Sequence, residues 1–126
     1  YYPAHREVAK QVYGMAGITN KDINSFQTYD SFSVHLLFAL EGYGFCKEGE
    51  VGDFIQDGRI ELSGDLPCNT SGGMLSESYM QGWNHQPEII RQIRGEAGKR
   101  QIKKADYIQY NGDAMGNAMS IIYRKA

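Results

Sequence analysis

The order in which helical and strand-like patterns alternate constrains the fold of this chain more than any other feature. Apolar residues recur near the helical period over residues 4–16 and 31–43, and a third helix is expected from about Met80 to Arg94. Stretches rich in strand-favouring residues separate or follow these helices, at residues 24–28, 60–62, 107–110 and 119–123. Such alternation predicts a single α/β domain over residues 1–126, with a mixed sheet.

Turn-forming residues set the expected ends of these elements. Gly17 ends the first helix, and Asp30 or Ser31 is placed to cap the second. Pro87 conflicts with an uninterrupted third helix, so it either kinks the first turns or marks the start of the regular part. The last two strands are joined by residues 111–116, and this short connection predicts a hairpin.

The second and third helices are both expected to bury apolar side chains. The second is apolar nearly all round, which is typical of a buried helix. The third has an apolar stripe formed by Trp83, Ile89, Ile90 and Ile93. We expect His35, on the second helix, to be a packing residue, and His85, on the third, to be a surface or packing residue.

Composition narrows the classes of function. The net charge of −2, from 13 basic and 15 acidic residues, gives no reason to expect nucleic acid or an anionic membrane as a partner. Cys46 and Cys68 lack CxxC spacing, which favours free thiols in a reducing compartment such as the cytoplasm. The histidines show no ligand spacing with these cysteines, so no metal site is expected. Because the chain begins at Tyr1 and not at methionine, we expect it to be one piece of a larger protein.

Five short runs occur in an order that is specific as a set, although each run alone is a weak signal. They are residues 29–32, 40–50, 57–60, 69–77 and 91–95. Together they resemble the C-terminal half of thiolase-superfamily proteins, in particular the lipid-transfer-protein or sterol-carrier branch. The resemblance implies a thiolase-like α/β fold with a mixed sheet covered by helices, in a subunit that forms a homodimer. It also implies that residues 29–33, 67–73 and 76–82 meet in space as one active site.

The departures from the family pattern concern the catalytic residues. Tyr29 stands where true thiolases of this branch have a histidine before an acidic residue, and Tyr79 stands where a second histidine follows the Gly-Gly turn. Tyr110 lies near the place of a C-terminal catalytic cysteine, while Cys46 and Cys68 match no catalytic cysteine. These changes argue against Claisen condensation and acyl-enzyme chemistry.

A tyrosine at both histidine positions resembles the thiolase-like aldolases of steroid side-chain breakdown. The resemblance implies a carbon–carbon lyase that cleaves a β-hydroxyacyl-CoA, with a steroid side chain as the expected acyl group, to a short acyl-CoA and a ketone. It implies an OB-fold partner protein as well. Coenzyme A belongs to the substrate in this reaction, so no separate cofactor is expected.

Two tyrosines are sufficient for a retro-aldol cleavage. A base takes the proton of the β-hydroxyl and an acid protonates the α-carbon, so no covalent intermediate is needed. We assign Tyr29 and Tyr79 as this pair, without deciding which is the base. Tyr79 is expected just before the third helix, where the helix dipole favours a phenolate. Asp30 either orients Tyr29 or caps the second helix.

The Gly-rich turn is expected to support the reaction. Asn69, through its amide, or backbone N–H groups near Gly72 and Gly73 would donate to the enolate oxygen, unless the two glycines only make a tight turn. Tyr110 is a supporting site residue or a structural strand tyrosine. Two other functions stay open: a thiolase or acyltransferase whose nucleophile lies elsewhere in the protein, and a non-catalytic module that binds acyl-CoA.

Overall fold

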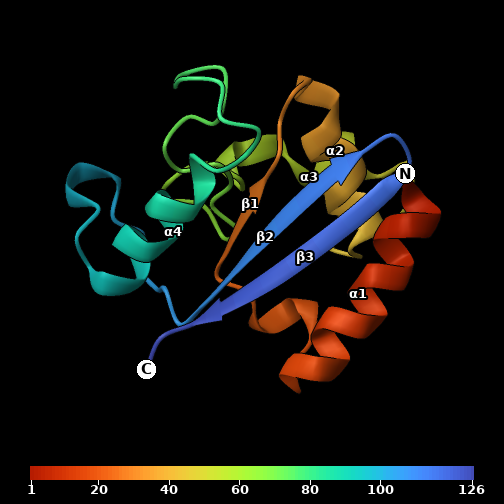
Figure 1. The fold of residues 1–126 in the computed structure, drawn as a ribbon, viewed down its shortest axis with the longest axis horizontal. Helices are drawn as coiled ribbons and strands as arrows, with labels where there is room; N and C mark the ends of the chain where they lie inside the picture. The colour runs from red at the N-terminus through yellow and green to blue at the C-terminus, as the bar shows by residue number, and fades with distance from the viewer.

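A three-stranded mixed sheet in the order β1-β2-β3 forms the centre of the computed structural model, which describes residues 1–126 (Figure 1). β1 (Ser25–Thr28) runs parallel to β2 (Tyr107–Ala114), which pairs antiparallel with β3 (Asn117–Arg124). The register places Thr28 opposite Asn111. The sheet therefore brings the carboxyl end of β1 against the middle of β2, where the next residue along the chain is Tyr29.

Helices cover both faces of this sheet, as the thiolase-like arrangement predicts (Figure 1). α1 (Tyr2–Ala16) and α2 (Ser33–Gly42) lie on one face, and α4 (His85–Arg94) lies on the other. Four short elements complete the chain: α3 (Val51–Phe54), η1 (Asn20–Asp22), η2 (Gln56–Gly58) and η3 (Gly98–Arg100). None of the helices is both long and apolar enough to cross a membrane.

Each face of the sheet has its own apolar cluster. The cluster under α1 and α2 is built around Phe26 and Leu40, which are fully buried. Gly42 lets these two helices approach, because a Cβ at this position would lie 2.4 Å from the Cβ of His5. The cluster under α4 is built around Ile89 and Ile108. This second cluster packs α4 against β2, and so it fixes the point at which the loop before α4 crosses the sheet.

The β2–β3 connection is tighter than the sequence predicts. The hairpin itself is confirmed, but its strands extend to Ala114 and from Asn117, so only Met115 and Gly116 form the turn. Both have positive φ, 52° and 81°, as a two-residue turn with this twist requires. Residues 111–114, which were expected to form part of a loop, therefore belong to β2, so Asp113 lies within the sheet and not at the tip of a loop.

The strand expected at residues 60–62 is absent, and this stretch forms turns and a bend. The outer edge of β1 is occupied instead by the start of the Gly-rich turn. The N–H of Phe26 donates to the carbonyl of Pro67 at 3.0 Å, and the N–H of Asn69 donates to the carbonyl of Phe26 at 3.2 Å. A local preference for strand is not sufficient without a partner, and here residues 67–69 take that place.

The two predicted buried helices are only partly buried. The expected cap of α2 is wrong, because its N-cap is Phe32, whose side chain makes no capping bond and is 67% exposed. α4 begins at His85, so Pro87 falls in its first turn, where the missing N–H costs nothing. Of the predicted stripe on α4, Ile89 is buried, whereas Trp83 lies before the helix and is 69% exposed.

Candidate active site

The three segments expected to form a site do meet in the structure, at the end of β1. The hydroxyl oxygens of Tyr29 and Tyr79 lie 3.1 Å apart. The carboxylate of Asp30 accepts from the N–H of Met74, which closes the Gly-rich turn against the same strand end. Residues far apart in sequence are thus joined by direct hydrogen bonds around Tyr29.

The environment of the tyrosine pair differs from the expectation in one respect. Tyr79 was expected at a helix N-terminus, but α4 begins only at His85 and Tyr79 lies in a loop with its side chain 67% exposed. The helix-dipole argument for a Tyr79 phenolate is therefore wrong. The hydrogen bond to Tyr79, with a smaller contribution from burial, raises the pKa of Tyr29 above its ordinary value. Tyr29 is thus held protonated at neutral pH.

Asp30 does not cap α2 and does not contact the Tyr29 hydroxyl. Its Oδ1 accepts a hydrogen bond from Nε2 of His85 at 3.1 Å, and both of its oxygens accept from the N–H of Met74. Burial alone would raise the pKa of Asp30, but the bonds from His85 and Met74 outweigh it and hold the pKa below its usual range. Asp30 is therefore an ionised acceptor that connects three segments.

The Gly-rich turn is built around two constraints. The Asn69 side chain binds the backbone of Thr28 in both directions, since its Oδ1 accepts from the N–H at 2.8 Å and its Nδ2 donates to the carbonyl at 3.2 Å. The N–H of Gly72 donates to the carbonyl of Asn69 at 2.7 Å. Gly73 has φ +67°, and a Cβ there would lie 2.0 Å from Oδ2 of Asp30. The Asn69 amide and the Gly72 N–H are thus engaged within the chain, while Gly73 is needed for the approach to Asp30.

Tyr110 extends the site along β2. Its ring is buried and packs on His85 with 5.9 Å between the ring centroids. Burial, with smaller contributions from Tyr29 and Asp113, raises the pKa of Tyr110 to about 12. Gly82, with φ +87°, crosses directly over the Tyr110 hydroxyl and the Tyr29 ring. Tyr110 is therefore a residue of β2 whose side chain lies near that of Tyr29, under Gly82.

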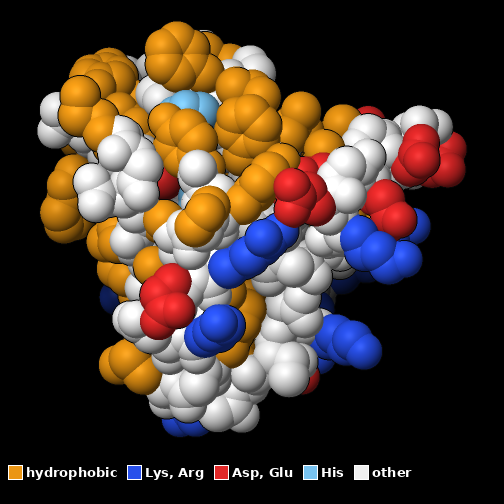
Figure 2. Space-filling view, turned by 90° about the vertical axis from the view of Figure 1, so that its right-hand side faces the viewer, with side chains coloured by type: hydrophobic (Ala, Val, Ile, Leu, Met, Phe, Trp, Pro, Cys, Tyr) orange, Lys and Arg blue, Asp and Glu red, His pale blue; other side chains and the backbone are white.

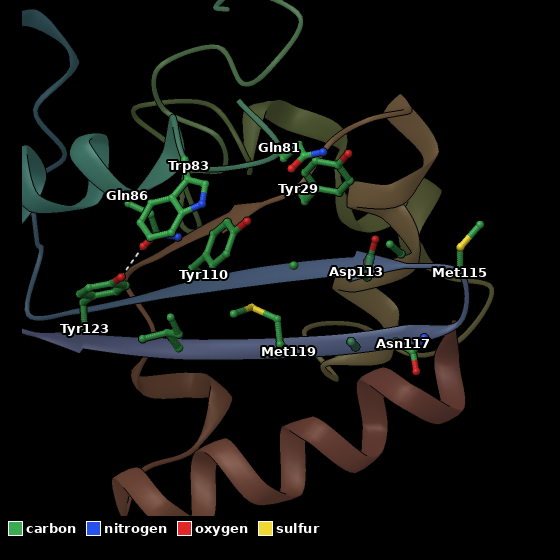
Figure 3. Close-up of a pocket in the computed structure, with 14 residues that line it drawn as sticks. Tyr29, Gln81, Trp83, Gln86, Tyr110, Asp113, Met115, Asn117, Met119 and Tyr123 are labelled. Atoms are coloured by element: carbon green, nitrogen blue, oxygen red, sulfur yellow. Dashed lines mark hydrogen bonds between the residues drawn. The ribbon is translucent and has the colours of Figure 1, made fainter. Parts of the chain in front are cut away.

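A cavity of about 710 Å³ opens beside these tyrosines, over β2 and β3. Figure 3 shows Tyr29, Tyr110 and Trp83 on one side of it and Met119 on the strand below. Most of its lining is hydrophobic. The cavity can accommodate an apolar group whose reactive end faces the tyrosines.

Sequence reasoning missed a buried polar cluster on the opposite face of β2. Asp113 Oδ2 lies 2.7 Å from Nε2 of His5 and accepts from Nδ2 of Asn111 at 3.0 Å, while its Oδ1 lies 3.1 Å from Nδ1 of His35. Burial would raise the pKa of Asp113, but the bonds from His5 and Asn111 and the nearby histidines hold it below its usual range. His5 and Asp113 are 108 positions apart, so no local spacing could have indicated this contact.

Neither cysteine has the environment of a nucleophile. Both are free, and both pack against the cluster under α1 and α2. Burial, with the nearby carboxylates of Glu41 and Glu50, raises the pKa of Cys46 to about 11, and burial alone raises that of Cys68. A thiol with a raised pKa is mostly protonated and reacts slowly. Neither thiol is therefore placed to act as a nucleophile.

Comparison with known proteins identifies a matching family and several relatives. Residues 2–125 match the family model described as thiolase C-terminal domain-like. The chain is 46% identical over 88 residues to the "Steroid side-chain-cleaving aldolase" of Thermomonospora curvata, a match that covers 70% of this chain and 22% of that protein. It is also 46% identical over 88 residues to the "17-hydroxy-3-oxo-4-pregnene-20-carboxyl-CoA lyase" of Mycobacterium tuberculosis, covering 70% of this chain and 23% of that protein.

A solved structure is similar over nearly the whole chain. The "Ltp2-ChsH2(DUF35) aldolase" superimposes with a TM-score of 0.88 at 36% identity, over 98% of this chain and 32% of that one. The chain spans less than a quarter of the length of the two curated relatives.

Proposed function

Because the chain belongs to the thiolase C-terminal domain-like family, we propose that it supplies the tyrosine pair of a retro-aldolase that acts on a β-hydroxyacyl-CoA. The observation that carries the proposal is the 3.1 Å contact between the hydroxyls of Tyr29 and Tyr79. The names of two relatives, an aldolase and a CoA lyase, support this reaction class. Coenzyme A enters as part of the substrate, and the chemistry requires no further cofactor.

The proposed reaction moves two protons and breaks one carbon–carbon bond. In this proposal Tyr79 is the base and acts as its phenolate, with the Tyr29 hydroxyl 3.1 Å from its oxygen. The Tyr79 oxygen takes the proton of the β-hydroxyl, the bond between the α- and β-carbons breaks, and the electron pair of that bond passes to the thioester as an enolate. Tyr29, whose pKa is raised by the hydrogen bond to Tyr79 and by burial, then protonates the α-carbon. The products are a ketone and a shorter acyl-CoA.

The Gly-rich turn offers the Gly73 N–H as a donor for the enolate oxygen in this proposal. The Asn69 amide is engaged with Thr28 and the Gly72 N–H is engaged with Asn69. The N–H of Gly73 has no acceptor among the backbone hydrogen bonds of the turn. A preorganised donor of this kind typically contributes about 3–4 kcal/mol to transition-state stabilisation.

The acyl group is proposed to be a steroid side chain. Support comes from the apolar cavity beside Tyr29 and from the names of the two relatives, which refer to a steroid side chain and to a pregnene-carboxyl-CoA. The chain is proposed to be the C-terminal part of a larger homodimeric subunit with an OB-fold partner. In the view of Figure 2 hydrophobic side chains gather in the upper part of the molecule, and the exposure of large apolar residues such as Phe32 and Trp83 supports the presence of partner surfaces. The two free thiols fit a reducing compartment, for which we propose the cytoplasm.

The test uses the complete subunit with its partner and a β-hydroxyacyl-CoA that has a steroid-like side chain. We expect Tyr29→Phe and Tyr79→Phe each to lower kcat by about 10²–10⁴-fold, as loss of a general acid or base does. Tyr107→Phe is the matched control, because Tyr107 is a half-buried strand tyrosine that packs against the other face's core. Release of ketone and acyl-CoA would be followed by chromatography.

Near-normal rates in both tyrosine variants would refute the proposal. Transfer of an acyl group to free CoA, in place of ketone release, would indicate the acyltransferase alternative. Binding of acyl-CoA without turnover in the wild type would indicate the non-catalytic module.

A further inference from the structure

The loop that carries Tyr79 has little contact with the rest of the chain. All of residues 75–81 are exposed, including Leu75 at 74% and Met80 at 54%. Exposed loops of this kind occupy many conformations unless their ends are tied down. The 3.1 Å contact between Tyr79 and Tyr29 therefore requires a device that fixes where the loop starts and where it ends.

One carboxylate holds both ends of this loop. At the start, both oxygens of Asp30 accept from the N–H of Met74, at 3.1 and 3.2 Å. At the end, Oδ1 of Asp30 lies 3.1 Å from Nε2 of His85, the first residue of α4. Asp30 follows Tyr29 directly, so the same residue ties the loop to the strand end that carries the other tyrosine.

The hydrogen bond to Asp30 is the one polar contact of the His85 ring. The side chain of His85 is fully buried, and its ring packs on Tyr110. Its Nδ1 has no hydrogen-bond partner, so Nε2 makes the single polar contact of the ring. An ionised carboxylate can only accept, which places the imidazole proton on Nε2 in this contact. Both the tautomer and the direction of the ring are thus set by Asp30.

We propose that Asp30 and His85 form a clamp that holds the Tyr79 loop over Tyr29, with His85 as a positioning residue for the tyrosine pair. Asp30 acts through the loop ends rather than by contact with either hydroxyl. The inference rests on the proposed function where turnover is the measure, but the clamp itself is a statement about the loop. Charge-assisted hydrogen bonds are the stronger class, and the lowered pKa of Asp30 keeps this acceptor ionised.

The experiment compares His85→Phe with His85→Gln in the complete subunit. Phenylalanine fills the ring's space without a donor, whereas the Nε2 of glutamine can still donate to Asp30. The first readout is amide hydrogen exchange at Met74, Ser76 and Trp83, whose N–H groups are bonded at the loop ends. We expect exchange about 10-fold faster or more in His85→Phe, the size of one lost bond to a charged group, and near-normal exchange in His85→Gln.

The second readout is turnover. We expect kcat of His85→Phe to fall at least 10-fold with KM changed less than threefold, and His85→Gln to recover most of the loss. His5→Phe serves as the control for the exchange measurement, because it breaks another fully buried histidine–aspartate contact away from the loop. It should lower thermal stability and leave exchange at the loop ends unchanged.

The clamp is overturned if His85→Phe leaves exchange at the loop ends at its wild-type value, or if His85→Gln changes exchange as much as His85→Phe does. The two proposals fail separately. Faster exchange in His85→Phe, together with full activity of Tyr79→Phe, would keep the clamp and reject the two-tyrosine reaction. Inactive Tyr79→Phe with unchanged exchange in His85→Phe would do the reverse.

Discussion

Replacing Gly82 by alanine tests whether the Tyr79 loop must cross the site at close contact. A Cβ at Gly82 would lie 2.2 Å from Oη of Tyr110 and 3.1 Å from Cδ2 of Tyr29, whereas an ordinary contact is at least 3.4 Å. The loop and the Tyr110 hydroxyl must therefore separate by about 1 Å in Gly82→Ala. The Tyr110 side chain cannot move aside easily, because its rigid ring is buried on β2 against His85.

The magnitude follows from two separate contributions. Alanine at φ +87° adds backbone strain of about 1–2 kcal/mol, which lowers stability. Displacing one member of a catalytic pair by about 1 Å can lower the rate by about 100-fold. Gly95 provides a matched control, since it has φ +74° but open space around its Cα, so Gly95→Ala adds the strain without the displacement.

The assay measures kcat/KM for ketone release and the thermal unfolding midpoint of each variant. We expect similar losses of stability in Gly82→Ala and Gly95→Ala, and a fall in kcat/KM of about 100-fold in Gly82→Ala alone. Equal activity of the two variants would refute the reasoning, because the close crossing over Tyr110 would then have no bearing on the tyrosine pair.

Two further predictions concern the opposite face of the sheet. Asp113→Asn should lower the free energy of unfolding at pH 7 by about 1–3 kcal/mol, because the histidines lose their charged acceptor. The pKa of Asp113 is lowered in the folded state, so its contribution to stability is complete above the unfolded pKa of about 3.9 and is lost as the pH falls through the folded value. The thermal unfolding midpoint should therefore fall less steeply toward acid pH in Asp113→Asn than in the wild type. Gly42→Ala should lower the unfolding free energy by about 1–3 kcal/mol in thermal melts, since its Cβ would lie 2.4 Å from that of His5 and force α1 away from α2. A wild-type midpoint in Gly42→Ala would contradict the packing described for these helices.

Elements with strong local signals could be predicted from the sequence. α1 ends at Gly17 in a left-handed conformation, as glycine after an amphipathic run indicates. The strand before Tyr29 and the final hairpin follow from alternation and turn residues. The meeting of Tyr29 with Tyr79 was expected only from the resemblance, since nothing in local spacing relates them.

The start of α4 could not be predicted from residue preferences. Residues 80–84 carry enough apolar side chains to continue a helical pattern, but Gln81 and Gly82 have φ of 52° and 87°, which no α-helix contains. The chain turns there because Gly82 has to cross Tyr110, a contact made across the fold. Tertiary packing of this kind overrides helix propensity, which is a weak preference.

The buried polar residues were the largest omission. The spacing of His5 and His85 in the sequence does not predict a site. His5 contacts Asp113 and His85 contacts Asp30, and both contacts exist only because the fold brings distant residues together. The prediction for Trp83 was also wrong, because its apolar side chain suggested burial, whereas it is exposed and lines a cavity. An apolar side chain need not be buried in the core when it lines a cavity.

The parallel pairing of β1 with β2 has a consequence for how the protein folds. The hydrogen bond between Thr28 and Asn111 joins positions 83 residues apart, and the two strands are not connected by a single turn. Contacts of such long sequence separation form slowly, because chain entropy is lost before they are made. Tyr29 takes its position only when its own N–H is bonded to the carbonyl of Asn111. The tyrosine pair is therefore expected to appear at the last cooperative step of folding, and no compact intermediate lacking β2 can hold it.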